Sequence, residues 1–262
     1  MRRLGLNYYP PLGLSVTDFA SALSECGFGA TFTEYAPEKT LFEYANAFSK
    51  HNIAYETIHA PFDSINDMWL DKPGADDALS RLCLTVNVCK SLSVPVAVVH
   101  LSSGVNAPSI TDIGRYRYKR LVEYAAECGV KIAFENQRKL ANIAWACEEF
   151  ENYENVGFCW DVGHEGCFAH GREYMPLFGK RLICTHIHDN DLKPNHDLHM
   201  IPFDGRIDFY KVAKQIKANG FAGTLMLELM IDNSDYYVNS SPRAYIERAA
   251  FAAKRLRDMI DN

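Results

Sequence analysis

The chain has 262 residues and a formal net charge of −6 at pH 7, with 48% hydrophobic and 23% charged residues. This composition is ordinary for a soluble globular protein, α/β barrels reach this length with a single core, and no apolar run approaches the roughly 18 residues of a membrane span. The negative charge disfavours a partner as anionic as duplex DNA, so a small molecule is the expected ligand.

The first residues and the cysteines bear on where the protein works. Met1-Arg2-Arg3 passes directly into an alternating strand pattern, without the apolar core of a signal peptide. The 8 cysteines are scattered singly and form no CxxC pair, which favours reduced thiols over a disulfide framework. Together these features predict a cytoplasmic protein.

Short apolar runs typical of buried strands alternate with longer segments of helical period along the whole chain. Strands are expected at Leu4–Tyr9, Ala30–Glu34, Ala54–His59, Val96–Leu101, Lys131–Glu135, Val156–Trp160, Leu182–His188 and Thr224–Glu228. Helices are expected at Val16–Cys26, Leu41–Lys50, Ala75–Ser91, Thr111–Cys128, Leu140–Phe150, Phe209–Ala218 and Ser241–Met259, with a weak one at Arg172–Phe178. The alternation predicts one domain over residues 1–262, an α/β fold of the (β/α)8 TIM barrel type.

An open doubly wound sheet would show the same alternation. It would also carry a Gly-rich phosphate loop after its first strand, where this chain has Asn7-Tyr8-Tyr9-Pro10-Pro11. The barrel is therefore the expected architecture.

Polar residues follow six of the expected strands at their carboxyl ends, where a barrel places its chemistry. They are His59, His100, Glu135, Asp161 with His164 after it, His186 with His188, and Glu228. In a closed barrel these side chains would converge, and acids packed with imidazoles away from water are costly unless a cation compensates. Carboxylate oxygens with imidazole nitrogen suit Mn²⁺, Mg²⁺, Zn²⁺ or Co²⁺. The pattern predicts a divalent-metal site.

Six separated motifs resemble those of the xylose isomerase-like TIM barrels. They are Glu135-Asn136, Val156–His164, His186–Asp191, Asp197-Leu198-His199, Gly205–Phe209 and Gly220–Glu228. This superfamily includes sugar and sugar-phosphate isomerases and epimerases, and also the endonuclease IV type of abasic-site endonuclease. The resemblance spans nearly the whole chain.

In the isomerase and epimerase members, a Glu, an Asp, a His and a Glu from strands five to eight hold one metal ion. These positions correspond to Glu135, Asp161, His188 and Glu228, and the two glutamates also act as acid and base. The resemblance thus implies a metal-dependent isomerase or epimerase of carbohydrate metabolism that moves a proton through an enediolate. It also suggests a homo-oligomer, either a dimer or a tetramer.

Other residues are expected to contact the substrate, namely His164, His59, His100, Tyr8 and Arg206. His186 and His188 are two residues apart, so their side chains share one face of the expected strand, with His186 deeper in the barrel. If His186 binds the metal instead of His188, the metal ligand on this strand moves by two residues. No convergent Lys/Arg pair or Gly-rich loop is apparent, so an unphosphorylated sugar or polyol is the expected substrate.

The rival interpretation is a trinuclear zinc endonuclease. Endonuclease IV relatives use three zinc ions on nine ligands, and this chain has a candidate for each: His59, His100, Glu135, Asp161, His164, His188, Asp197, His199 and Glu228. Net charge and short loops after the second and fourth strands, with little to enter a DNA groove, favour the isomerase or epimerase. A sugar-acting lyase or dehydratase and a non-catalytic sugar or metal binder are the remaining alternatives.

Overall fold

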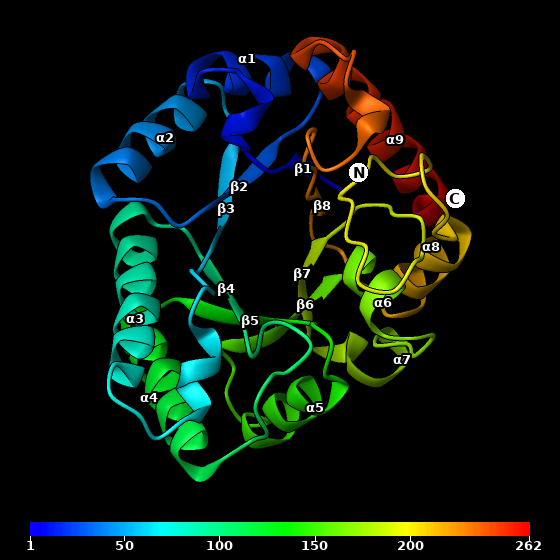
Figure 1. Cartoon of the computed structure of the whole chain (residues 1–262). Helices are drawn as coiled ribbons and strands as arrows, with labels where there is room; N and C mark the ends of the chain where they lie inside the picture. Colours follow the sequence, from blue (N-terminus) through cyan, green and yellow to red (C-terminus); the bar gives the residue numbers. More distant parts are fainter.

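A computed structural model describes residues 1–262 and shows the eight parallel strands of a (β/α)8 TIM barrel (Figure 1). The strands are β1 Leu4–Leu6, β2 Ala30–Glu34, β3 Ala54–His59, β4 Val96–His100, β5 Lys131–Glu135, β6 Val156–Asp161, β7 Leu182–His186 and β8 Leu225–Leu227. Their order in the sheet is β7-β6-β5-β4-β3-β2-β1-β8. The eight predicted strands are all present, with differences only at their ends.

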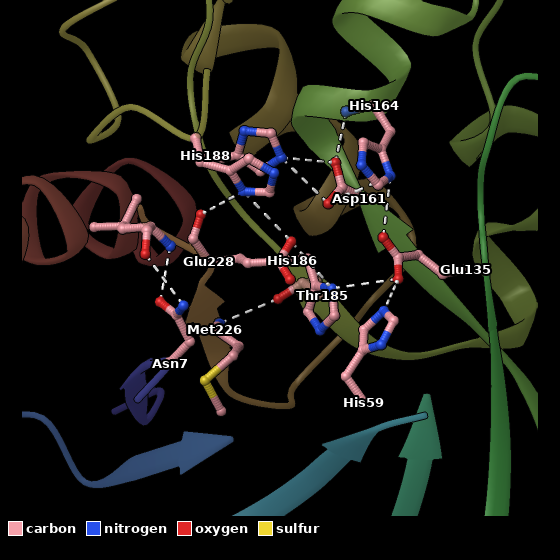
Figure 2. A network of polar contacts seen from close by, with 12 residues as sticks. Asn7, His59, Glu135, Asp161, His164, Thr185, His186, His188, Met226 and Glu228 are labelled. Atoms are coloured by element: carbon pink, nitrogen blue, oxygen red, sulfur yellow. Dashed lines mark hydrogen bonds and ion pairs between the residues drawn. The ribbon is translucent and has the colours of Figure 1, made fainter. Parts of the chain in front are cut away.

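The barrel closes between β7 and β8 just beyond the regular strands. Ile187 N donates to Met226 O at 2.9 Å, and Glu228 N donates to Ile187 O at 3.2 Å. The Thr185 hydroxyl accepts from Met226 N at 3.2 Å (Figure 2). It donates to Thr224 O at 3.3 Å. This closure brings the end of β8 against the end of β7.

Helices form the outer ring around the strands (Figure 1). They are α1 Val16–Cys26, α2 Glu38–Lys50, α3 Ala75–Leu92, α4 Asp112–Cys128, α5 Leu140–Glu149, α6 Val162–Phe168, α7 Met175–Phe178, α8 Phe209–Ala218 and α9 Pro242–Asp261, with short 3-10 turns η1 Pro10–Leu12, η2 Ile65–Trp69, η3 Gly179–Arg181 and η4 Asp235–Tyr237. None of the helices combines the length and the apolar character needed to cross a membrane.

Local sequence explains many helix boundaries. The Ser15 side chain accepts from Asp18 N at 3.1 Å at the start of α1, and the Thr111 side chain accepts from Gly114 N at 3.3 Å at the start of α4. Both helices end at a glycine in the left-handed conformation, Gly27 with φ 88° and Gly129 with φ 70°. These boundaries confirm the sequence-based ones to within a residue.

Three helices differ from expectation. α2 begins at Glu38, directly after Pro37, rather than behind Thr40. α6 was not predicted, and the weak helix expected at Arg172–Phe178 is limited to the four residues of α7. Gly163 lowers the local helix propensity of α6, but the Asp161 side chain caps that helix by accepting from His164 N at 2.6 Å.

The main hydrophobic core lies between the strands and the helical ring. Inside the barrel, a second cluster fills the end away from the strands' carboxyl termini; we call it the base, and it consists of Val96, Val98, Ala133 and Cys159. The barrel interior is therefore apolar at the base. Its polar side chains lie at the opposite end, the mouth, where the strands have their carboxyl termini.

Candidate active site

The polar side chains predicted at the strand ends do converge at the barrel mouth (Figure 2). They come from six neighbouring elements and are all buried: His59, His100, Glu135, Asp161, His186 and Glu228. Parallel strands in register place their inward side chains at one level, and His100 is directly opposite Glu135 in the β4–β5 pair. The predicted convergence is confirmed.

The central group contains Glu135, Asp161, His186 and Glu228. One nitrogen or oxygen from each side chain lies within 4.8 Å of those from the other three. Nδ1 of His186 is 3.6 Å from Glu135 Oε2 and 3.5 Å from Glu228 Oε2 (Figure 2). These separations are too long for hydrogen bonds and leave room for a cation among the four side chains.

The histidine of β7 in this group is His186, whereas the resemblance implied His188. Nε2 of His188 lies 3.1 Å from Asp161 Oδ1, and its ring stacks on His199 with centroids 4.0 Å apart. The reason is positional: β7 ends at His186, and the two further residues carry His188 outward along the mouth. The group assembled by the fold therefore differs from the implied ligand set at this one position.

Two further groups flank the centre. In the first, Nε2 of His59 and Nε2 of His100 each lie 3.0 Å from Glu135 Oε2. The second consists of His164, His188, Asp197 and His199. Asp197 Oδ2 is 3.1 Å from His164 Nε2 and 3.3 Å from His199 Nε2. The outer residues named in the rival interpretation are thus brought together as well.

A folded-back segment between β7 and α8 carries Asp197 and His199. Asp189 anchors it, because its Oδ2 accepts from Gly205 N at 2.8 Å and its Oδ1 accepts from Ile207 N at 2.9 Å. Position 205 has no space for a side chain: an added Cβ would lie 2.4 Å from the backbone oxygen of Asn190. The Gly205–Phe209 motif therefore shapes the mouth rather than contributing chemistry.

Gly163 has a similar packing role beside the site. A Cβ at this position would lie 1.9 Å from Cε1 of His188. With glycine, α6 can start directly after Asp161 and aim His164 into the mouth while His188 lies against the helix. The Asp161-Val162-Gly163-His164 motif is thus explained by close packing.

Burial opposes charge throughout the mouth, and neighbouring groups decide which side chains stay charged. Burial disfavours protonation of His59 and His186, but the surrounding carboxylates prevail and raise the pKa of His59 to about 9 and that of His186 to about 10. At His100 burial prevails and lowers the pKa to about 4. The carboxylates of the mouth thus favour a positive charge beside them, whether on an imidazole or on a bound cation.

The donor set fits a divalent cation. Several buried polar atoms of the mouth have no hydrogen-bond partner: Nδ1 and Nε2 of His186, Nδ1 of His188, Nδ1 of His100 and Oδ1 of Asp197. Unpaired buried polar atoms are costly, and imidazole nitrogen with carboxylate oxygen suits Zn²⁺, Mn²⁺ or Co²⁺. Their clustering in the mouth is the structural observation that supports metal binding.

The mouth opens into a cavity of about 530 Å³. Besides the polar residues above, its lining includes several that the sequence-based reasoning did not single out: Phe62, Ser103, Gln137, Arg138, Phe168 and Met230. Gln137 Nε2 lies 3.1 Å from His100 Nε2 and 3.0 Å from His164 Nδ1. Gln137 lies two residues after Glu135, a spacing that points both side chains to the same side of an extended chain, and this spacing is the signal that could have identified it.

Two residues expected at the substrate lie outside this lining. The Tyr8 ring packs on Phe19 and Tyr44, and its hydroxyl donates to Leu14 O at 3.3 Å. Arg206 is exposed on the segment before α8. The chain leaves the barrel after Leu6 and turns through η1, which directs Tyr8 toward the helical ring.

The comparisons with known proteins agree with this architecture. The family model described as xylose isomerase-like TIM barrel matches residues 21–255. Uncharacterized protein y4fM of Sinorhizobium fredii is 35% identical over 155 residues, covering 58% of this chain and 46% of that protein. Uncharacterized protein MJ1311 of Methanocaldococcus jannaschii is 24% identical over 188 residues, and the match covers 65% of this chain and 63% of that protein. The chain thus spans less than two thirds of either relative.

Solved structures share the fold at low sequence identity. D-psicose 3-epimerase of Clostridium cellulolyticum H10, solved with D-tagatose, has a TM-score of 0.78 at 13% identity and covers 98% of this chain and 99% of its own. The 3-keto-D-glucoside 4-epimerase of E. coli has a TM-score of 0.75 at 16% identity, with coverages of 97% and 100%. An L-ribulose 3-epimerase has a TM-score of 0.75 at 15% identity, and the match covers 100% of this chain and 97% of that structure's chain. Given the family match over most of its length, the chain belongs to the xylose isomerase-like TIM barrel family.

Proposed function

We propose that this chain is a divalent-metal-dependent sugar isomerase or epimerase in which Glu135 and Glu228 are the acid/base pair. The observation that carries the proposal is the placement of these two buried carboxylates on either side of His186, at 3.6 Å and 3.5 Å from its Nδ1. The epimerases that share this fold support the reaction class.

The residues proposed to hold the cation are Glu135, Asp161, His186 and Glu228, with His186 replacing His188 of the implied set. A bound Mn²⁺, Mg²⁺, Co²⁺ or Zn²⁺ supplies Lewis-acid polarisation of a sugar carbonyl and its neighbouring hydroxyl, which acidifies the C–H between them. One metal ion per chain is the expected stoichiometry.

The protein side chains carry the proton. One of the two glutamates removes it from the acidified carbon, leaving an enediolate, and for epimerisation the other glutamate returns a proton to the opposite face. For aldose–ketose exchange, the proton moves between adjacent carbons. The amide nitrogen of Gln137 and the ring of His164 line the cavity and are positioned to hydrogen-bond substrate hydroxyls.

The experiment that tests this proposal measures solvent deuterium entering sugars. The metal-loaded protein is incubated in D₂O with a panel of ketoses and aldoses, and exchange at the carbon next to the carbonyl is followed by NMR. Exchange with wild type, and none with Glu135→Gln or Glu228→Gln, is the expected result. Sugar affinity without exchange on any substrate would instead identify a non-catalytic binder.

A trinuclear zinc endonuclease is the second candidate, favoured by the three adjacent groups of potential ligands. Three zinc ions could activate water and hold a phosphodiester. Against it, the net charge is −6 and Arg138 is the one lysine or arginine in the cavity lining. About three zinc ions per chain together with cleavage of an abasic duplex would establish this function.

A further inference from the structure

Arg138 is a cationic side chain at the cavity edge with no acidic partner. It lies between β5 and α5, three residues after Glu135, and is the single lysine or arginine of the lining. No carboxylate oxygen lies within ion-pair distance of it, although Asp197 lines the same cavity. Partial burial lowers the pKa of Arg138 by more than nearby Cys167 and Asp197 raise it, so an anionic ligand in direct contact would favour its charged form.

Two contacts fix the direction of the guanidinium. Nε donates to Asn195 Oδ1 at 2.9 Å, and Cζ lies 3.6 Å from the centroid of the Phe168 ring. Phe168 stacks in turn on His164, with centroids 4.8 Å apart and planes inclined by 25°. The Phe168 ring therefore lies between the guanidinium and His164 of the second flanking group, and the guanidinium is oriented before any ligand binds.

The backbone holds the Asn195 anchor in place as well. Asn195 has a left-handed conformation with φ 59°, and its N donates to Cys167 O at 3.0 Å near the end of α6. With Nε and one face of Arg138 engaged, the two terminal Nη groups keep their donors free of any partner in the protein. Two parallel N–H donors match the two oxygens of a carboxylate.

Building on the proposed function, we propose that the substrate is a sugar acid whose carboxylate binds the Nη groups of Arg138 while its carbonyl end reaches Glu135 and Glu228. One guanidinium suits the single charge of a carboxylate. A phosphate monoester carries nearly twice that charge, and the lining has no second lysine or arginine to balance it. Arg138 is thus assigned as the residue that selects the substrate class.

Calorimetric titration of the full-length protein, with Mn²⁺ and after chelation, tests this assignment. The ligands share one carbon skeleton: a ketohexose, the ketohexuronate with a carboxylate at C6, and the ketohexose 6-phosphate. The ketohexuronate should bind at least about tenfold more tightly than the ketohexose, and Arg138→Gln should bring the two affinities to within about twofold of each other. Arg138→Lys should keep part of the preference, because lysine keeps the positive charge but loses the two parallel N–H donors that match a carboxylate.

Arg172→Gln is the matched control, because Arg172 is exposed and lies outside the cavity lining. It should retain the full preference, and thermal unfolding verifies that each variant is folded. Equal affinity of wild type for acid and neutral sugar, a preference that survives in Arg138→Gln, or tighter binding of the 6-phosphate would overturn the assignment.

Deuterium exchange separates this inference from the proposed function. An Arg138-dependent carboxylate preference without exchange on any ligand would contradict the isomerase or epimerase and leave the assignment of Arg138 standing. Exchange on the ketohexose with no preference for the acid would contradict the assignment alone.

Discussion

The two ends of the barrel interior are built from the same strands with opposite chemistry. On β5, Ala133 belongs to the base and Glu135 to the mouth. On β6, Cys159 and Asp161 stand in the same relation, two residues apart on one face of the strand. Positions only two residues apart on a strand therefore belong to different environments, one a packed apolar layer and the other a cluster of acids and imidazoles.

This difference separates stability from chemistry. The base buries apolar side chains that need no ligand, so it contributes dispersion and hydrophobic free energy in every state of the protein. The mouth buries polar atoms that lack hydrogen-bond partners, so its free energy depends on what binds there. Changes at the base should therefore cost stability, and changes at the mouth should cost activity.

Removing either proposed acid/base should have the largest effect. Glu135→Gln and Glu228→Gln keep the side-chain shape but lose the group that moves the proton, so turnover should fall by about 10³-fold. Val98→Ala at the base should instead cost about 1–3 kcal/mol of unfolding free energy and leave turnover intact. Steady-state kinetics and denaturant unfolding measure both; normal turnover in either glutamine variant would contradict the assignment.

Metal removal should affect the mouth alone. At a free cation concentration of 100 times Kd, binding stabilises the folded protein by about 2.7 kcal/mol, so chelation should lower Tm and adding the cation back should restore it. Glu135→Gln should lose most of this metal-dependent shift, and Val98→Ala should keep it. Differential scanning calorimetry supplies the measurement, and a shift unchanged in Glu135→Gln would place the cation elsewhere.

One methyl group added at each end gives a matched comparison. In Gly163→Ala a Cβ would meet His188 at 1.9 Å, and in Gly157→Ala it would meet Ile183 at 2.6 Å. Displacement of His188 should lower turnover by up to about 100-fold, whereas overpacking against Ile183 should cost about 1–3 kcal/mol of stability with turnover retained. The measurement is turnover per folded molecule in each variant. Equal losses of turnover in Gly163→Ala and Gly157→Ala would contradict the distinction between base and mouth.

Tyr8→Phe should have the smallest effect. The Tyr8 hydroxyl donates to Leu14 O at 3.3 Å and does not reach the cavity, so its loss should cost about 1 kcal/mol of stability and change turnover by less than about twofold. Thermal unfolding and kinetics check this expectation. A large rise in KM would support the substrate contact that the sequence suggested.

Local patterns were enough to predict the fold. The bounds of β2, β3 and β5 and of α1 and α8 follow from hydrophobic period, capping residues and turn glycines, all of which act within a few residues. The convergence of His59, His100, Glu135, Asp161 and Glu228 was also predictable, because a closed parallel barrel leaves the carboxyl ends of its strands only one place to meet.

Tertiary structure decided the rest. In the predicted strand Leu182–His188, His186 and His188 share one face, so their sequence positions cannot distinguish them. In the structure β7 ends at His186, and Glu135 and Glu228 approach this histidine, which puts His186 at the centre. Arg138 likewise became a candidate only once α6 brought Phe168 beneath its guanidinium. The sequence alone thus determined which side chains would gather at the mouth, whereas contacts between distant segments determined which of them touch, because those distances depend on the packing of the whole barrel.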